Sequence, residues 1–322
     1  MKYRPLGASG IMVSEIGFGG WGIGGVTPGP TSYGPTDDNE SRKALEAAFN
    51  NGISYYDTAG VYGKSEELIG RTFKHRRGQV VIGTKIGFLE HHTPQDFSRK
   101  NIFSTLEKSL RNLGTDYVDL YQLHNPDIQN LRMDEIVSAL KELKIRGLVR
   151  ALGVSVKHPN HGLLALKYGE FCSIQVNLSM IDQRAIDNSL LDQAREQGIG
   201  IIARTPLNFG FLTDNGTTMD LNFGPEDHRS VWPMEQRVAW QKAARLLSEV
   251  HPEYPLATLA LRYCLSVTGV STVIPGLLTV SDVLENTTTS NLPLLSPETM
   301  AKIREIYNDN DQFFVRQPSP PK

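Results

Sequence analysis

The stretch IFSTLEKSLRNLGTDYVDLYQLH, residues 102–124, contains the pattern that decides the fold. Its first half, Ile102–Leu113, has apolar residues at helical spacing, and Gly114 follows as a typical helix stop. Its second half, Val118–His124, is a short β-rich run that ends in a histidine. Helices that alternate with strands indicate parallel pairing, because parallel strands need a long crossover connection rather than a tight hairpin.

The same alternation recurs along the chain. Further helical spacing occurs in Asn39–Phe49, Met133–Ile145, Ala185–Gln197, Gln236–Val250 and Leu256–Leu265. Further β-rich runs are Glu15–Phe18, Ile53–Asp57, Val80–Lys85, Ala151–Ser155, Ser173–Asn177, Ile199–Arg204 and Val270–Pro275. About eight βα units predict an α/β fold of the (β/α)₈ TIM-barrel type, with an open, doubly wound sheet as the alternative.

The remaining segments complete the predicted architecture. Tyr3–Val13 is interpreted as a β-hairpin placed to plug the barrel floor. The segments Gly24–Thr36 and Thr213–Pro233 lack periodicity and predict long loops on the substrate side. No change of composition divides the chain, so we predict a single domain over residues 1–322, with a disordered tail at residues 317–322.

Composition excludes several classes of protein. The 322-residue chain carries 33 Lys and Arg against 35 Asp and Glu, a net charge of −2, without the basic excess of a nucleic-acid binder. Two cysteines are too few for a disulfide framework or a cysteine-based zinc site. No apolar run reaches the roughly 18 residues of a membrane span, and Met1–Pro5 leads into no signal-peptide core. We therefore expect a soluble, cytosolic protein that acts on a small molecule.

Two nucleotide-binding motifs are matched only in part. Gly17–Gly22 fits G-x-G-x-x-G, but Pro28 and Pro30 exclude the helix that must follow in a dinucleotide fold, so close backbone packing is the better interpretation. Gly63-Lys64-Ser65 resembles the end of a P-loop, yet Thr58 stands where that loop needs glycine. Ser65 is instead predicted to cap a helix.

Three successive predicted strands end in an ionisable residue, namely Asp57, Lys85 and His124. Taken singly, each has an ordinary explanation. Asp57 could cap a helix, Lys85 could be a solvated charge at a sheet edge, and His124 could be a core histidine with its hydrogen bonds made. In a parallel barrel, however, all strand ends meet on the face that carries active sites. Their joint occurrence predicts a catalytic rim.

Tyr62 lies five residues after Asp57, close enough to turn back over the same rim. A phenol has a pKa near 10 and donates its proton more readily beside a buried ammonium, which an aspartate would hold in place. No cysteine or activated serine accompanies the set. Asp57, Tyr62, Lys85 and His124 thus favour reversible carbonyl reduction, with hydride from a cofactor.

A metal-dependent hydrolase is a weaker alternative. It requires clustered His, Asp or Glu ligands. The close pairs His91-His92 and His158/His161 are interpreted as solvated loops, so no metal is predicted.

Five short motifs occur together in the chain: Tyr56-Asp57-Thr58-Ala59-x-x-Tyr62-Gly63, Gly83-Thr84-Lys85, Gln122-Leu123-His124, Leu152-Gly153-Val154-Ser155 and Ile274-Pro275-Gly276. In order and spacing they resemble the aldo-keto reductase superfamily over roughly residues 1–308. The resemblance implies a barrel that binds an extended nicotinamide dinucleotide and reduces an aldehyde or ketone, including sugars. It also implies Tyr62 as proton donor, Lys85 and Asp57 as its tuning pair, and His124 as the residue that orients the substrate carbonyl.

The resemblance further implies which residues bind the cofactor and substrate. Val156 and Arg204 depart from the family pattern, where asparagine and tyrosine are common. Trp21 and Phe88 are expected in the substrate pocket. The implied cofactor residues are Gly20, Trp21, Asp57, Ser155, Gln175, Arg204, Pro206, Leu207, Leu212, Gly276, Thr279, Asp282, Glu285 and Asn286.

The choice of dinucleotide rests on the segment after the last strand. The family usually places Arg or Lys at the position of Leu278, where it pairs with the 2′-phosphate of NADP(H). Asp282 would accept ribose hydroxyls and repel a phosphate, which favours NAD(H). Alternatively, Asp282 only caps its helix, and Thr279 or a distant arginine holds the phosphate. A catalytically weak sensor that binds the cofactor is the alternative function.

Overall fold

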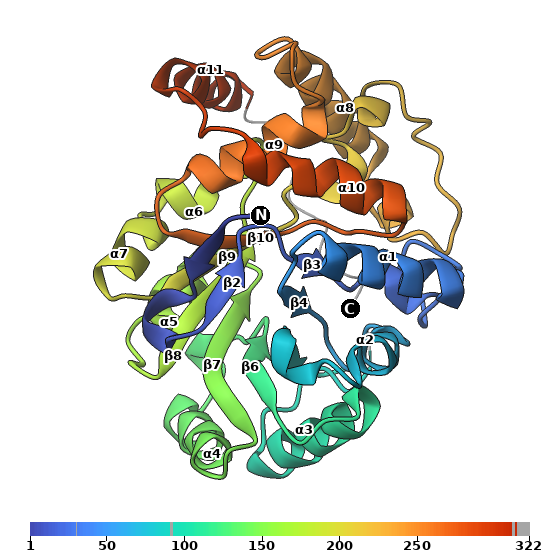
Figure 1. The fold of residues 1–322 in the computed structure, drawn as a ribbon. Coiled ribbons are helices and arrows are strands. Elements are labelled where there is room, and N and C mark those ends of the chain that lie inside the picture. The colour runs from blue at the N-terminus through green and yellow to red at the C-terminus, as the bar shows by residue number, and fades with distance from the viewer. Residues whose placement is uncertain (30, 91–92, 311–312, 314–322) are drawn as a thin grey trace.

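Eight parallel strands form the core of the computed structural model (Figure 1), which describes residues 1–29, 31–90, 93–310 and 313. Each strand pairs with its neighbour in chain order, from β3 to β10. Isolated parallel bridges, Ile16 to Val273 and Gly19 to Gly276, join the first strand to the last. The closed (β/α)₈ barrel is therefore confirmed over the open sheet. The strands are β3 Phe18–Gly19, β4 Tyr55–Asp57, β5 Val81–Ile86, β6 Val118–His124, β7 Val149–Val156, β8 Phe171–Asn177, β9 Gly200–Arg204 and β10 Val270–Ile274.

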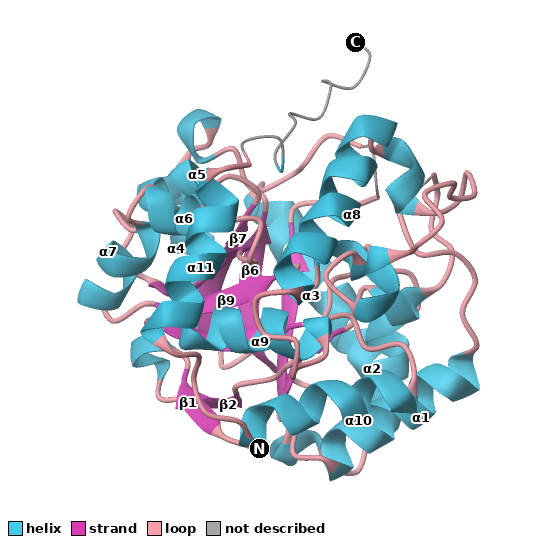
Figure 2. Cartoon of the chain, turned by 90° about the horizontal axis from the view of Figure 1, so that it is seen from above, coloured by secondary structure: helices cyan, strands magenta, loops and turns pink. Residues whose placement is uncertain are grey.

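Helices surround these strands, as Figures 1 and 2 show. None of the helices in the described part of the chain is both long and apolar enough to cross a membrane. The predicted tail, residues 317–322, lies outside the described residues, and the single-domain organisation stays a prediction. The helices are α1 Asp38–Asn50, α2 Ser65–Phe73, α3 Arg99–Leu113, α4 Met133–Ile145, α5 Pro159–Ala165, α6 Arg184–Asp187, α7 Leu190–Glu196, α8 Met234–Ser248, α9 Leu256–Ser266, α10 Val280–Thr288 and α11 Pro297–Asn308.

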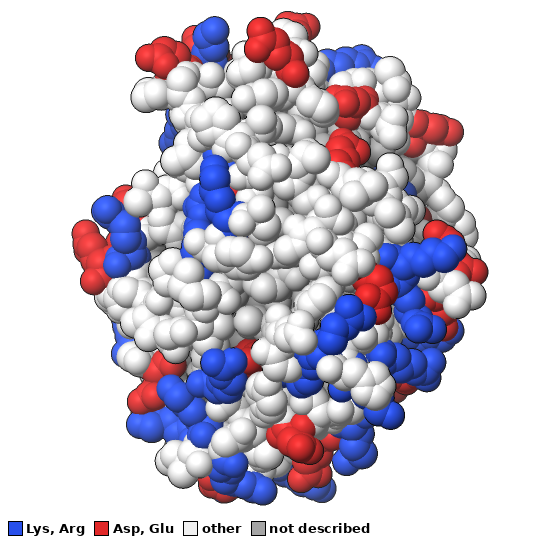
Figure 3. All heavy atoms as spheres, in the orientation of Figure 1, with Lys and Arg blue, Asp and Glu red and all other residues white. Residues whose placement is uncertain are grey.

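The N-terminal hairpin closes one end of the barrel. β1 Tyr3–Pro5 pairs antiparallel with β2 Met12–Ser14, and both lie at the lower end of the strands in Figure 2. Leu6, Ile11 and Val13 are buried in one apolar cluster with side chains from the barrel interior. This burial fixes the hairpin as the barrel floor, as the sequence predicted. On the face that carries the hairpin, basic and acidic side chains are mixed around the edge (Figure 3).

Two local predictions about helices are wrong. The segment Ala185–Gln197 is two helices rather than one, because Ser189 adopts a left-handed conformation (φ 62°) between α6 and α7. Ser65 does not cap α2. The N-cap is Lys64, and the Ser65 hydroxyl accepts a hydrogen bond from Thr58 Oγ1 at 2.8 Å. By contrast, the Asp37 side chain caps α1, accepting the main-chain N–H groups of Asn39 and Glu40.

The glycine-rich segment Gly17–Gly22 packs closely against the strand ends, as predicted. The Gly20 N–H donates to the Asp57 carbonyl at 2.8 Å, and a Cβ atom at Gly20 would lie 2.7 Å from that oxygen. A Cβ atom at Gly24 would lie 2.0 Å from the Tyr62 carbonyl. Glycine is required at both positions because any side chain would push away the loop that carries Asp57 and Tyr62.

Candidate active site

A cavity of about 940 Å³ opens at the carboxyl ends of the strands. Its walls include Asp57, His124, Asn177, Arg204 and Ile274, the last residues of β4, β6, β8, β9 and β10. Of the three residues of the predicted rim, Asp57 and His124 line this cavity, and Lys85 does not. The predicted site residues that line it are Trp21, Asp57, Tyr62, Phe88, His124, Gln175, Arg204, Pro206, Leu207, Gly276, Asp282, Glu285 and Asn286.

Five predicted site residues do not line the cavity. Gly20, Lys85, Ser155 and Leu212 are buried behind its wall, and Thr279 is exposed where α10 begins. Lys85 and Ser155 nevertheless contact lining residues directly, as described next. The other three contact lining residues through the main chain: the N–H groups of Gly20, Leu212 and Thr279 donate to the Asp57 carbonyl, the Leu207 carbonyl and Asp282 Oδ2.

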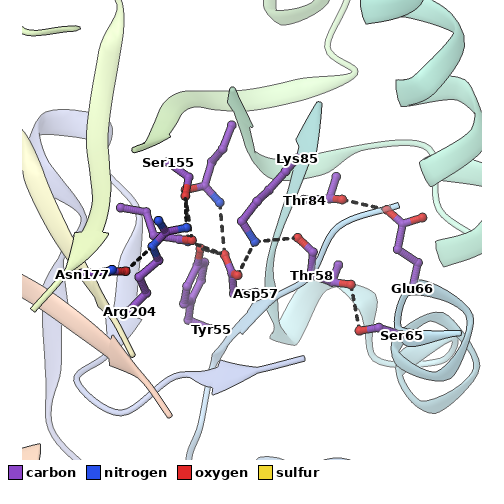
Figure 4. Close-up of polar contacts among 12 residues, drawn as sticks. Tyr55, Asp57, Thr58, Ser65, Glu66, Thr84, Lys85, Ser155, Asn177 and Arg204 are labelled. Carbon is purple, nitrogen blue, oxygen red and sulfur yellow. Dashed lines mark hydrogen bonds and ion pairs between the residues drawn. The ribbon is translucent and has the colours of Figure 1, made fainter. Parts of the chain in front are cut away.

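Asp57 lies at the centre of a buried polar network (Figure 4). Lys85 Nζ donates to Asp57 Oδ1 and, at 2.9 Å, to the Thr58 carbonyl. The Lys85 side chain is fully buried, and that of Asp57 is 4% exposed. Asp57 is the last residue of β4 and Lys85 the next-to-last residue of β5, and these two strands pair in parallel, which brings the side chains together.

The second carboxylate oxygen of Asp57 accepts three hydrogen bonds. Tyr55 Oη donates at 3.1 Å, Gln122 Nε2 at 3.1 Å and Gln175 Nε2 at 2.7 Å. Of these donors, only Gln175 was predicted. Alternation along the strands points to the others, because Tyr55 precedes Asp57 by two residues and Gln122 precedes His124 by two, on the same face.

Lys85 stays charged in this setting. Burial alone would lower its pKa, but the Asp57 carboxylate and the Tyr62 side chain outweigh burial and raise the pKa above its usual value. Its Nζ lies 4.8 Å from the centre of the Tyr62 ring. The Tyr62 ring meets the His124 ring edge-on, with centroids 5.8 Å apart. A phenol and an imidazole therefore line the cavity, and a paired ammonium is buried beside the phenol ring.

A second polar group lies beside the first, at the ends of β7, β8 and β9. Ser155 Oγ donates to Gln175 Oε1 at 3.1 Å and accepts from Arg204 Nη1 at 3.2 Å. Arg204 also donates to Asn177 Oδ1 at 2.7 Å and to the Val156 carbonyl at 3.1 Å. No carboxylate is among these hydrogen-bond partners, which removes the ordinary explanation of a rim arginine paired with an acid.

The segment after β9 has a strained backbone. Thr205, Asn208 and Phe209 all have positive φ angles, of 54°, 43° and 60°. Non-glycine residues rarely adopt this conformation, and it recurs at binding sites. Pro206 and Leu207, predicted to follow the cofactor, line the cavity here.

At the far end of the cavity, Asp282 caps α10. Its Oδ2 accepts the N–H groups of Leu278 and Thr279 at 3.0 and 2.9 Å, while Thr279 Oγ1 accepts the Asp282 N–H at 3.1 Å. This reciprocal capping box was the alternative interpretation of Asp282. Burial, Asp214 and Asp282 raise the pKa of Glu285, so this end of the cavity is acidic.

Within the described residues, no three His, Cys, Asp or Glu side chains lie close enough to hold a metal ion. His91 and His92 fall outside those residues. His161 was predicted in a solvated loop but lies in α5, where Nδ1 is 3.0 Å from the Pro126 carbonyl oxygen.

The sequence model of the "Aldo/keto reductase family" matches residues 15–308. The chain belongs to this family. A solved aldo-keto reductase from Bacillus halodurans, in its holo form, superposes with a TM-score of 0.79 at 31% identity, covering 95% of this chain and 96% of that one. The NADH-specific methylglyoxal reductase of Escherichia coli K12 is 32% identical over 91% of this chain and 95% of its own length. Membership makes the chain an NAD(P)-dependent oxidoreductase.

Two of the similar proteins bear a different kind of name. A probable voltage-gated potassium channel subunit beta from Arabidopsis thaliana is 29% identical over 95% of this chain and 96% of its own length. The aldo-keto reductase fold is therefore compatible with more than one role, and the residues at the cavity have to distinguish between them.

Proposed function

We propose that this aldo-keto reductase reduces a small aldehyde or ketone to the alcohol, with Tyr62 as the proton donor. The observation that carries the proposal is the meeting of Tyr62, His124 and the Lys85–Asp57 pair at the cavity wall. A protein that only binds the cofactor gains nothing from a buried ammonium fixed beside a phenol. A cytosolic location stays a prediction from the sequence.

Each residue has one task in the reduction. Tyr62 gives its hydroxyl proton to the carbonyl oxygen as the C=O double bond becomes a single bond. Lys85, held by Asp57 and the Thr58 carbonyl, stabilises the phenolate that remains. His124 orients the carbonyl oxygen. A reduced nicotinamide dinucleotide, when bound, supplies the hydride that adds to the carbonyl carbon and is itself oxidised.

The residues of the cavity fit such a cofactor. Asn286 is buried, lines the cavity and has an Oδ1 atom without a hydrogen-bond partner, as expected of a group that receives a ligand donor. Ser155, Gln175 and Arg204 would hold the carboxamide end. Gly276, whose Cβ direction is open, and Pro206 would flank the phosphates.

We further propose NAD(H) rather than NADP(H). Residues 276–286 contain no Lys or Arg. Asp282 and Glu285 line this end of the cavity, and Asp214 is close enough to raise the Glu285 pKa. A 2′-phosphate would therefore meet carboxylates, and this segment supplies no cation to pair with it. The NADH specificity in the name of the Escherichia coli relative supports the same choice.

The test is turnover by the purified protein. A panel of aldehydes, ketones and sugars is offered with NADH or NADPH, and cofactor oxidation is followed by absorbance. Tyr62→Phe should lower kcat by at least ~10²-fold, because it removes a positioned general acid. Its cofactor affinity, measured by fluorescence titration, should stay within about twofold of wild type.

Tyr117→Phe serves as the matched control, since Tyr117 packs against Arg77 outside the cavity. Turnover near the wild-type rate in Tyr62→Phe would remove the proton-donor assignment. Cofactor binding without turnover of any carbonyl would support the sensor role instead.

A further inference from the structure

His228 is a cavity residue that the proposed reduction does not use. It lies in the long loop after β9, its residue exposure is 6%, and it is one of the residues that line the cavity. Neither ring nitrogen has a hydrogen-bond partner, and the nearest carboxylate oxygen, Asp227 Oδ1, is 3.7 Å from Nδ1. A buried polar group left without a partner costs stability unless a ligand satisfies it.

The position of His228 is fixed on every side. Its ring meets those of Trp21, Tyr33 and Phe209 edge-on, with centroids 4.6, 4.7 and 4.7 Å away. Its main-chain N–H donates to the Ser32 carbonyl at 2.8 Å, which ties the two long loops together. The imidazole is therefore preorganised rather than a mobile loop side chain.

Asn125 is a second, independent polar group of the same kind. It directly follows His124, lines the cavity, and has a left-handed backbone with φ of 53°. Its Oδ1 atom is buried without a hydrogen-bond partner. This oxygen accepts hydrogen bonds and offers none, so it needs a donor from the ligand rather than an anion.

The chemistry of the missing partner follows from these two groups. Burial lowers the pKa of His228 to about 4, so the imidazole is neutral at physiological pH and offers one donor and one acceptor. A hydroxyl group both donates and accepts, and satisfies either residue. The rings of Trp21 and Phe209 belong to residues that line the same cavity, and aromatic faces of this kind suit the C–H groups of a ligand.

We propose that His228 and Asn125 form a hydroxyl-recognition subsite, so that the substrate is a carbonyl compound carrying one or more hydroxyl groups. The inference rests on the proposed reductase function and adds the substrate class. A site built to bond a hydroxyl discriminates against the analogue that lacks it, because its own polar groups then stay unpaired.

The test compares two three-carbon aldehydes, glyceraldehyde and propanal, which differ only in hydroxyl groups. The measured quantity is the ratio of their kcat/KM values, in which a general loss of activity cancels. Wild type should favour glyceraldehyde by at least about tenfold. His228→Phe keeps the ring packing and Asn125→Gly keeps the positive φ, and each should lower the ratio about threefold to tenfold. His228→Gln, which retains a donor and an acceptor, should restore part of the ratio.

His251→Phe is the control, since His251 also has an unpartnered Nδ1 but stacks on Tyr254 outside the cavity. Its ratio should equal that of wild type. Thermal melts establish that each variant is folded. If His228→Phe does not fold, the ratio measured for Asn125→Gly tests the subsite instead. A wild-type ratio near one, or equal losses with both aldehydes, overturns the subsite while leaving the reductase function intact. If the protein turns over neither aldehyde and no carbonyl compound of the wider panel, both the subsite and the reductase function are overturned.

Discussion

Lys85 and Asp57 form an ion pair that is withdrawn from solvent, with side-chain exposures of 0% and 4%. Burying two charges is costly, and the cost is offset here by mutual attraction together with the Thr58 carbonyl and three donors on Asp57. The pair therefore fixes the position and the charge of the Lys85 ammonium more than it stabilises the fold. Removing one partner and removing both should have very different effects.

Asp57→Asn should leave the Lys85 ammonium buried without a counter-charge. We expect the free energy of unfolding to fall by about 3–5 kcal/mol, measured by urea titration. The double variant Asp57→Asn/Lys85→Met should recover part of this loss while its kcat stays at the background level.

Glu67→Gln is the control for that experiment, because Glu67 pairs with Arg71 on the surface of α2. An exposed pair of this kind contributes at most about 1 kcal/mol. If Asp57→Asn destabilises no more than Glu67→Gln, the buried pair is screened, and the argument for a fixed ammonium beside Tyr62 fails.

Tyr55 should act as a positioning residue through Asp57. Tyr55→Phe removes the hydrogen bond to Asp57 Oδ2, and we expect kcat to fall about threefold to tenfold with KM unchanged. Tyr56→Phe provides the comparison, since the buried Tyr56 hydroxyl donates to the Ile53 carbonyl instead. Both variants lose one hydrogen bond, so equal kcat values for the two would assign Tyr55 a structural role only.

The sequence was sufficient for the barrel and for the rim, because both depend on local order. Strand ends in a parallel barrel share one face wherever the helices lie, so Asp57, Lys85 and His124 could be grouped without knowing a single distance. The break between α6 and α7 was missed because it rests on one left-handed serine, Ser189, whose conformation leaves no mark in the apolar spacing.

The sequence alone could not predict which polar side chains of the loops reach the cavity. His228 lies more than a hundred residues after His124, in a segment without periodicity, and reaches the cavity only because Ser32 pairs with Asp227 across the two long loops. Such non-local pairing has no local sequence signal. The sequence alone also left the role of Asp282 undecided, because a carboxylate that caps a helix and one that binds a ribose look alike in sequence.

That capping role changes how cofactor preference should be tested. Replacing Asp282 would break the capping box that it forms with the N-cap residue Thr279, so Leu278→Arg alone is the better variant. Leu278 lines the cavity, and an arginine there would pair with a 2′-phosphate. We expect kcat/KM with NADPH to rise at least about tenfold while that with NADH changes little.

Leu284→Arg is the matched control, on the exposed side of α10, the helix that follows Leu278, and away from the cavity. It should leave the ratio of NADPH to NADH activity unchanged. A wild-type kcat/KM about a hundredfold better with NADPH than with NADH would contradict the proposed preference.

His228 should also make stability depend on pH. Burial, only partly offset by Asp227, lowers its pKa from 6.5 to about 4 in the folded protein, and Arg229 acts in the same direction as burial. Above about pH 6.5 the His228 imidazole is unprotonated in both the folded protein and the unfolded chain. Between about pH 6.5 and 4 the unfolded chain binds the proton and the folded protein does not, so stability is lost as pH falls through this range, by about 3 kcal/mol in total. Carboxylates titrate in the same range, so wild type must be compared with His228→Gln by urea unfolding at several pH values. The stability advantage of wild type should be largest near pH 7.5 and shrink toward pH 4, whereas an advantage that is constant with pH would show that the imidazole is not held neutral by burial.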